Sequence, residues 1–194
     1  MALKLHGIPM STCTTRVLTC LHEKGLDFEL VPVNLFAGEH KQPPFLAKNP
    51  FGQIPVLEDG DFTLFGLTVP EFYHLVWLEV ESQHYYPAIY QIVYQFFALP
   101  LQGKTADQAI IDVNLEKLGT VLDVYEARLG TTKCLAGDFY SLADLHHLSY
   151  TYYFMKTPWA SLINSRPNVK AWWEDISSRP AFKKVAEGMT FGEK

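Results

Sequence analysis

Ser11 and Thr12 are two hydroxyl residues that stand directly before a stretch with helical spacing, in the segment GIPMSTCTTRV. The first N–H groups of a helix have no partner inside the helix and lie at the positive end of its dipole, so they attract an anion. A hydroxyl there can donate a hydrogen bond to that anion, or it can serve only as the helix N-cap. If the anion is a thiolate, lowering its pKa by about two units from ~8.5 requires about 2.7 kcal/mol. A charge-assisted hydrogen bond of roughly 1.5–3 kcal/mol and a dipole contribution of roughly 0.3–1 kcal/mol together supply this.

A second candidate is the tripeptide Gln53-Ile54-Pro55, which precedes a predicted strand. Cis X-Pro bonds are uncommon and usually serve a purpose, and we predict one at Ile54–Pro55. The backbone N–H and C=O of Ile54 would then face outward and pair with an extended peptide as if it were an added strand. The alternative is an ordinary trans proline at the start of an edge strand. His40 and Lys41 form a small basic spot in a polar loop, which is either an anion site or a solvated loop.

Other residues with possible chemistry give weaker signals. Cys13, two residues after Ser11, is either a low-pKa thiol or a small packing residue. His146 and His147 lack metal-ligand spacing, so no metal site is predicted. An aromatic cluster either packs in the core or lines a pocket for a flat apolar molecule; its members are Tyr85, Tyr86, Tyr90, Tyr94, Phe96 and Phe97.

The elements that must position these residues change in character near residue 66. Strands are predicted at LKLHG and DFELVPVNL, with Pro32 placing the second at an edge or a bulge. A helix is predicted between them, ending at Lys24-Gly25. A hairpin with an Asp59-Gly60 turn follows in IPVLEDGDFTLF. Residues 1–66 are therefore predicted to be an α/β domain with a mixed sheet.

Residues 67–194 are predicted to be all-helical. Thr68 and Glu71 fit a capping box, and the helical pattern continues to about Leu99 with a kink at Pro87. A second capping box, Ser141 to Asp144, opens a buried helix, and two short helices close the chain. An amphipathic helix that ends at Gly130 is predicted before the Ser141 capping box. Its predicted apolar face consists of Ile110, Val113, Leu115, Leu118, Leu122 and Tyr125.

Composition restricts the kinds of partner. The chain has 194 residues, 48% of them hydrophobic, and a net charge of −5, which argues against nucleic acid and acidic membranes. No apolar run reaches the length of a membrane span, and the N-terminus is too short in its apolar part for a signal peptide. Three cysteines without paired spacing indicate free thiols and a cytoplasmic location.

In combination, these motifs resemble those of the plant phi-class glutathione transferases. The resemblance covers nearly the whole chain and is carried by MSTCTTRVLTCLHEKGLDFELVPV, GEHKQPPFLAKNPFGQIPVLEDGD, WLEVESQ, LDVYEARLG, CLAGDFYSLADLHHL and RPNVKAWWEDISSRPAFKKV. It implies a thioredoxin-like first domain, a helical second domain with a hydrophobic second-substrate site, and a homodimer. The family's activating serine falls on Ser11. The family's glutathione-binding positions fall on Ser11, Thr12, His40, Lys41, Gln53, Ile54 and Pro55. The resemblance also implies glutathione as a co-substrate, with no separate cofactor.

The sequence departs from the family after Phe65. There the family has a Glu-Ser-Arg-Ala-type stretch that opens a helix, and its Glu and Ser hold the γ-glutamyl end of glutathione. Here Gly66 and Leu67 follow, and the helix and linker are deleted. The sheet face that the helix would have covered must then be covered by the helix beginning at Thr68 or by a partner chain. Losing two charge-assisted contacts of ~1.5–3 kcal/mol each weakens glutathione binding by roughly 10² to 10⁴.

Two functions are therefore consistent with the sequence. The first is conjugation of glutathione to hydrophobic electrophiles through a serine-stabilised thiolate, with reduced activity. The second is a weakly catalytic or non-catalytic carrier of planar apolar molecules. The intact Ser11, Ile54-Pro55 and basic loop favour the enzyme, whereas Gly66 and Leu67 favour the carrier.

Overall fold

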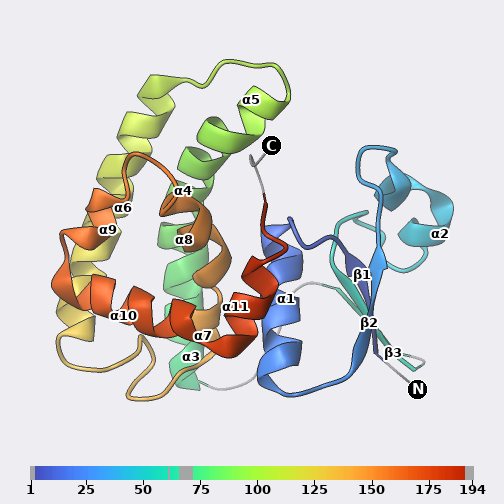
Figure 1. Cartoon of the computed structure of the whole chain (residues 1–194), viewed down its shortest axis with the longest axis horizontal. Coiled ribbons are helices and arrows are strands. Elements are labelled where there is room, and N and C mark those ends of the chain that lie inside the picture. Colours follow the sequence, from blue (N-terminus) through green and yellow to red (C-terminus); the bar gives the residue numbers. More distant parts are fainter. Residues whose placement is uncertain (1–2, 61, 66–71, 191–194) are drawn as a thin grey trace. The chain divides into compact units, whose positions relative to one another are not determined.

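The structure is a computed structural model of the chain that describes residues 3–60, 62–65 and 72–190. The chain forms two compact units (Figure 1). The first comprises Met1–Val69 with Lys184–Met189, and the second comprises Pro70–Lys183 with Thr190–Lys194.

A four-stranded sheet in the order β2-β1-β3-β4 is the centre of the first unit. β1 runs parallel to β2 and antiparallel to β3, and β3 and β4 form the predicted hairpin. β2 is an edge strand, as Pro32 led us to expect. The first unit's elements are β1 (Leu3–Gly7), α1 (Thr12–Glu23), β2 (Phe28–Pro32), η1 (Glu39–Lys41), α2 (Pro43–Leu46), β3 (Val56–Asp59) and β4 (Phe62–Phe65). This is a thioredoxin-like arrangement in which no described residue lies between the end of β4 and the next helix at Phe72.

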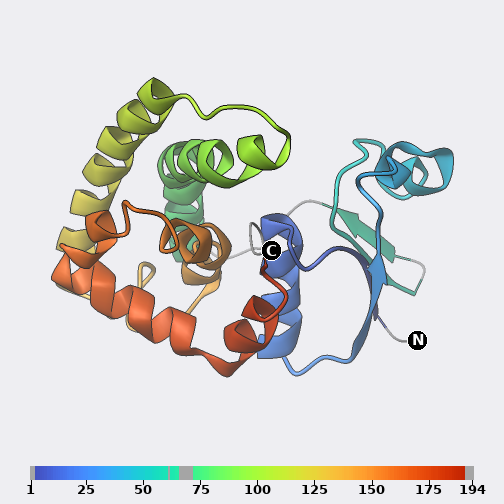
Figure 2. The same cartoon turned by 45° about the horizontal axis from the view of Figure 1, so that its top comes forward.

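The two faces of this sheet are covered by different elements. On one face Leu5 packs against Leu18 and Leu21 of α1. Val185, from α11 (Pro180–Ala186), joins the same cluster, so the end of the chain contributes to the cover of this face. Phe45 of α2 packs on Val56 of β3, and Figures 1 and 2 show α1 and α2 on opposite sides of the sheet. Thr68, predicted to begin a covering helix, lies outside the described residues.

The second unit is helical, as predicted, and its backbone is continuously helical from Phe72 to Leu101. Its elements are α3 (Phe72–Val80), η2 (Glu81–Tyr85), α4 (Tyr86–Val93), η3 (Tyr94–Ala98), α5 (Leu99–Leu101), α6 (Gln108–Leu129), α7 (Leu142–Leu145), α8 (Leu148–Phe154), α9 (Ser161–Asn164) and α10 (Pro167–Ser178). Instead of a clear break at Pro87, the helix widens into the π-turn η2 just before it. Proline has no N–H for the carbonyl four residues earlier, which is Gln83 within that turn. The Thr68–Glu71 capping box lies outside the described residues.

The predicted apolar face of α6 was wrong in its first turns. Ile110 and Val113 are 38% and 50% exposed, whereas Ile111 and Asn114 are buried. Leu118, Leu122 and Tyr125 fix the buried face, and helical spacing counted back from Leu118 reaches 114 and 111. Asn114 tolerates burial because its Nδ2 donates to the Ile110 carbonyl oxygen at 2.7 Å.

The Ser141–Asp144 capping box is confirmed, but the buried helix that it opens is divided into α7 and α8. His147 explains the division. Its ring Nδ1 donates to the Ala143 carbonyl oxygen at 2.6 Å, the acceptor that its own backbone N–H would use in a continuous helix. The His147 N–H donates to Asp144 O at 3.1 Å instead.

Candidate functional site

The strand register brings the predicted site residues to one end of the sheet. Gly7, the last residue of β1, lies beside Pro32, the last residue of parallel β2, and His6 lies opposite Val56, the first residue of β3. The segments that follow β1 and β2 and the segment that precedes β3 therefore start from the same edge of the sheet. They carry Ser11 and Thr12, His40 and Lys41, and Gln53-Ile54-Pro55, respectively.

Ser11 is the N-cap residue of α1, as its position before the helix predicted. Its Oγ accepts a 3.3 Å hydrogen bond from the Thr14 N–H, and its backbone carbonyl accepts from the Thr15 N–H at 2.8 Å. Among the described residues, the Ser11 hydroxyl proton has no acceptor. The half-buried side chain can therefore cap the helix and still donate a hydrogen bond to an anion.

The basic loop touches the segment before Pro55. Lys41 Nζ donates to the Phe51 carbonyl oxygen at 3.1 Å. A side-chain carbon at Gly52 would lie 2.8 Å from the His40 carbonyl oxygen, so the close approach requires glycine, as does its φ of +57°. His40 and Lys41 are thus held beside residues 51–53.

The Ile54–Pro55 bond is cis, which confirms that prediction. Neither the N–H nor the C=O of Ile54 forms a backbone hydrogen bond to another described residue. The Ile54 side chain packs on the cluster of Val33, Phe45 and Val56. The residue is therefore anchored by its side chain while its backbone groups stay available.

Asn49 is a functional candidate that the sequence reasoning missed. It is only 3% exposed, its Nδ2 donates to the Gln53 carbonyl oxygen at 2.8 Å, and its Oδ1 accepts from the Phe51 N–H at 3.1 Å. One carboxamide therefore closes the turn that leads to Gln53. The available signal was Asn-Pro, a turn-favouring pair in the sequence.

Other predicted features have mixed outcomes. Cys13 is half-buried and unpaired, and Cys20 and Cys134 are unpaired as well. Gly66, Leu67, Thr68 and Glu71 lie outside the described residues. Within the described ranges, no three His, Cys, Asp or Glu side chains gather as a metal site requires. No helix in that part of the chain is long and apolar enough to cross a membrane.

Only Tyr85 of the aromatic cluster is buried in the core, and the other five members are half-buried. Tyr85 is 1% exposed, and its hydroxyl shares a 2.6 Å hydrogen bond with Thr151. Phe96 and Phe97 pack on each other, with Trp159 and Tyr153 beside them.

Tyr86, Tyr90 and Tyr94 instead form a half-buried row along the helix. Their successive ring centroids are 5.6 and 5.5 Å apart, in stacked arrangements. Desolvation by burial raises the pKa of Tyr90, so its phenol stays protonated. This row offers aromatic surface in a stacked arrangement, and Phe96 and Phe97 are half-buried as well.

Comparison with known proteins gives consistent matches over both units. The family models for the glutathione S-transferase N-terminal and C-terminal domains match residues 1–66 and 80–180. Glutathione S-transferase F13 of Arabidopsis thaliana is 54% identical, over 98% of this chain and 97% of its own. The crystal structure of glutathione transferase F7 from Populus trichocarpa superimposes with a TM-score of 0.91 at 66% identity, covering 98% of this chain and all of that one. The structure of maize glutathione S-transferase I in complex with an atrazine glutathione conjugate matches with a TM-score of 0.91 at 44% identity, covering 97% of this chain and 98% of that one.

The chain belongs to the glutathione S-transferase family, and the phi-class resemblance is confirmed. It is an enzyme of that class, a glutathione transferase. The alignment with the Arabidopsis protein runs over 213 positions, although this chain has only 194 residues. The difference between 213 and 194 is 19, so at least 19 aligned positions hold a residue in that relative and none in this chain.

Proposed function

We propose that the protein conjugates glutathione to hydrophobic electrophiles and that Ser11 stabilises the glutathione thiolate. The observation that carries the proposal is the Ser11 hydroxyl at the start of α1, which still has a proton to donate. The thiolate sulfur forms a bond to the electrophilic carbon, and the leaving group departs with its electron pair. The thiol proton leaves to solvent before the attack. Ser11 lowers the barrier by donating to the sulfur anion beside the helix N-terminus.

The peptide part of glutathione would bind along the same end of the sheet. The free backbone groups of Ile54 offer one donor and one acceptor to an extended peptide. Lys41 offers positive charge to a carboxylate, His40 offers a ring nitrogen, and Thr12 and Gln53 complete the predicted set. These assignments follow the family motif residue by residue.

We further propose that glutathione binds weakly. The missing residues in the alignment with the Arabidopsis relative support a deletion, and the sequence after Phe65 lacks the Glu and Ser that hold the γ-glutamyl end in the family. Their loss corresponds to a roughly 10²- to 10⁴-fold reduction in affinity. Turnover then requires higher glutathione concentrations.

Calorimetric titration with glutathione and a conjugation assay with chlorodinitrobenzene test the proposal. Ser11→Ala should lower kcat/KM roughly 10- to 100-fold, which corresponds to the loss of a hydrogen bond to a charged group. The free energy of unfolding should fall by only about 1 kcal/mol, because the change removes a single N-cap hydrogen bond. Cys13→Ala, in the same turn, is the matched control and should leave conjugation unchanged. Equal activity of Ser11→Ala and the wild type would remove Ser11 from the mechanism.

A carrier function is the second candidate, favoured by the row of Tyr86, Tyr90 and Tyr94. Their stacked rings present planar aromatic surface on the helix, and aromatic rings stack well on flat molecules. Binding of a planar dye, followed by fluorescence, in protein that gives no conjugation would support this function. Tyr90→Ala should then weaken dye binding.

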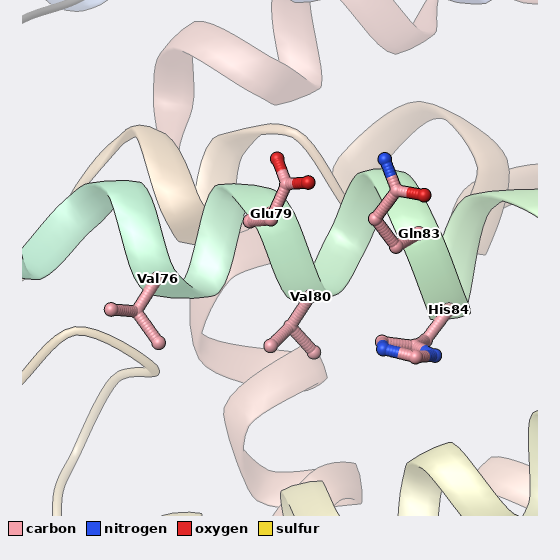
Figure 3. Close-up of a pocket in the computed structure, with 5 residues that line it drawn as sticks. All are labelled: Val76, Glu79, Val80, Gln83 and His84. Carbon is pink, nitrogen blue, oxygen red and sulfur yellow. The ribbon is translucent and has the colours of Figure 1, made fainter.

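A homodimer is the predicted assembly. Val76 is 59% exposed and lines a shallow surface hollow together with Glu79, Val80, Gln83 and His84. Figure 3 shows Val76, Val80 and His84 along one side of the helix. A second copy that covers Val76 and Val80 would remove these two side chains from water. Light scattering of the wild type and of Val76→Glu would measure the oligomeric state. The expected location of the protein is the cytoplasm.

A further inference from the structure

Glu58 of β3 is the centre of a charged cluster on the sheet face opposite α1. Its Oε1 accepts a 2.5 Å hydrogen bond from Lys48 Nζ, and its Oε2 is hydrogen-bonded to His6 Nε2. The cluster joins three separate elements, because His6 belongs to β1, Glu58 to β3 and Lys48 to the chain just after α2. Leu5 and Leu57 face the α1 side, so strand alternation places His6 and Glu58 on the other face.

The side chains of the cluster are partly buried, which shields their ion pairs from solvent. The side chains of His6, Glu58 and Lys48 are 12%, 24% and 32% exposed. The hydrogen bond from Lys48, and to a smaller extent the one from His6, lowers the pKa of Glu58. The Glu58 carboxylate is therefore charged throughout the neutral range. A partly buried pair is screened less than a surface pair and is correspondingly stronger.

Lys48 lies between the two halves of the proposed peptide site along the chain. His40 and Lys41 precede it, and Gln53 and Ile54 follow it. Its neighbour Asn49 closes the turn through the Gln53 carbonyl and the Phe51 N–H. Fixing Lys48 to β3 therefore fixes this turn relative to the strand that begins directly after Pro55.

We propose that Glu58, acting through Lys48 and His6, is a positioning residue for glutathione binding that sets the register between the basic loop and the backbone of Ile54. This inference rests on the proposed glutathione site. A displaced turn moves the Ile54 backbone groups away from the peptide and lengthens the hydrogen bonds that would hold it. Glu58 touches no substrate, so its loss affects the binding of glutathione rather than the attack on the electrophile.

The same sheet face offers a matched control. Lys4 of β1 and Glu29 of β2 form a 3.9 Å ion pair with side chains 53% and 61% exposed. Glu29→Gln removes one carboxylate from this face and leaves Lys4, which lies opposite Glu58 in the register, in place. Because no hydrogen bond or ion pair joins Lys4 or Glu29 to α2 or to the turn before Pro55 among the described residues, loss of this pair should not alter glutathione binding.

The experiment compares Glu58→Gln, Lys48→Met, the double variant and Glu29→Gln in the full chain. KM for glutathione and for chlorodinitrobenzene, kcat at saturation, glutathione affinity by calorimetry, and thermal unfolding are measured. Glu58→Gln and Lys48→Met should each raise KM and Kd for glutathione roughly 5- to 20-fold, with kcat and the electrophile KM within about twofold. The double variant should resemble the single ones, because the two residues act as one unit. Glu29→Gln should resemble the wild type.

Three results would overturn the inference. An unchanged glutathione KM in both Glu58→Gln and Lys48→Met would show that the cluster does not position the site. A parallel loss in kcat, both KM values and thermal stability would show a merely structural role. If the wild-type chain neither binds glutathione nor forms a glutathione conjugate, the proposed function fails first and this inference falls with it. An active wild type with unaffected Glu58 and Lys48 variants overturns this inference alone.

Discussion

Two polar sites, one in each unit, differ in how fully the folded chain satisfies their hydrogen bonds. In the second unit, Asp144 is fully buried and accepts from the Leu135 N–H, the Ser141 N–H and hydroxyl, and the Trp172 Nε1–H, all within 2.9–3.0 Å. In the first unit, the Ser11 hydroxyl and the Ile54 backbone retain unused hydrogen-bonding capacity among the described residues. Satisfied groups stabilise the fold, whereas unsatisfied groups at an accessible edge can bind a ligand.

Two histidines show the same contrast. His6 is partly accessible on the sheet, where it meets the charged Glu58. His147 is fully buried; its Nδ1 donates to Ala143 O and its Nε2 accepts from the Tyr125 hydroxyl at 2.9 Å. A carbonyl can only accept, so Nδ1 carries a proton, and in the neutral ring Nε2 is then the acceptor. Burial lowers the pKa of His147 to about 4, which agrees with the neutral ring.

Completing the first unit should give the largest effect. Insertion of a helix-opening segment with Glu and Ser between Phe65 and Val76 should tighten glutathione binding by roughly 10²- to 10⁴-fold, since it restores two charge-assisted contacts. Calorimetric titration measures the change, and the same segment with Gln and Ala in place of Glu and Ser is the control. If the present chain already binds as tightly as the restored one, another group, Thr68 or Glu71 first, performs the role of the missing residues.

Removing the Asp144 carboxylate from the second unit should give the next largest effect, a loss of folding stability. Asp144→Ala leaves four buried donors without their acceptor, and the free energy of unfolding should fall by roughly 3–5 kcal/mol. Urea unfolding followed by circular dichroism measures the loss. Asp138→Ala is the control, because the exposed Asp138 side chain accepts a single 3.0 Å hydrogen bond, from the Lys133 N–H, among the described residues, and its loss should cost about 1 kcal/mol. Similar losses in the two variants would contradict the contrast between the units.

His147 predicts a specific dependence of stability on pH. Its pKa is about 4 in the folded chain and ~6.5 when unfolded, so only the unfolded chain takes up this proton between those values. The stabilising contribution is complete above pH ~6.5 and falls by about 3 kcal/mol in total as pH drops towards 4. Urea unfolding from about pH 7.5 to about 4.5 measures the slope of stability against pH, because this range covers most of the interval between the two pKa values. His147→Gln should be less stable at neutral pH but should show a correspondingly smaller slope; an equal slope would show that other groups cause it.

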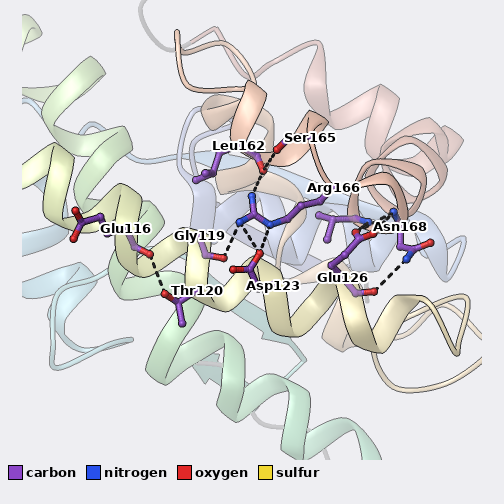
Figure 4. Close-up of polar contacts among 10 residues, drawn as sticks. Glu116, Gly119, Thr120, Asp123, Glu126, Leu162, Ser165, Arg166 and Asn168 are labelled. Atoms are coloured by element: carbon purple, nitrogen blue, oxygen red, sulfur yellow. Dashed lines mark hydrogen bonds and ion pairs between the residues drawn. The ribbon is translucent and has the colours of Figure 1, made fainter.

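The smallest effect concerns the contact between α6 and α10. The Glu126 carboxylate accepts from the backbone N–H groups of Asn168 and Val169 at 3.0–3.1 Å and so caps α10 from a neighbouring helix (Figure 4). Glu126→Ala should reduce the free energy of unfolding by about 1 kcal/mol. Thermal unfolding checks this against Glu116→Ala, an exposed position on the same helix that should show almost no change. A loss as large as that in Asp144→Ala would place this surface contact among the core interactions.

Local sequence patterns by themselves determined much of this protein. The hairpin at Asp59-Gly60, the helix that Ser11 caps and the Ser141–Asp144 capping box all depend on residues within a few positions of each other. Such features follow from turn chemistry, helix spacing and end effects, which a sequence displays directly. Local patterns had already singled out Thr12, His40, Lys41, Gln53 and Ile54, and the family motif assigned them to glutathione.

Only the tertiary structure decided which distant groups meet. Glu58 and His6 are 52 positions apart, and Asn168 lies 42 positions from Glu126. Near Ile110 the sequence offers apolar residues on two adjacent faces of α6, and packing of Leu118 and Leu122 selects one of them. The division between α7 and α8 likewise depends on where the His147 ring finds Ala143 O and Tyr125. Partners brought together by folding leave no periodic signal in the chain, because their spacing is set by the path of the backbone rather than by the repeat of a helix or a strand.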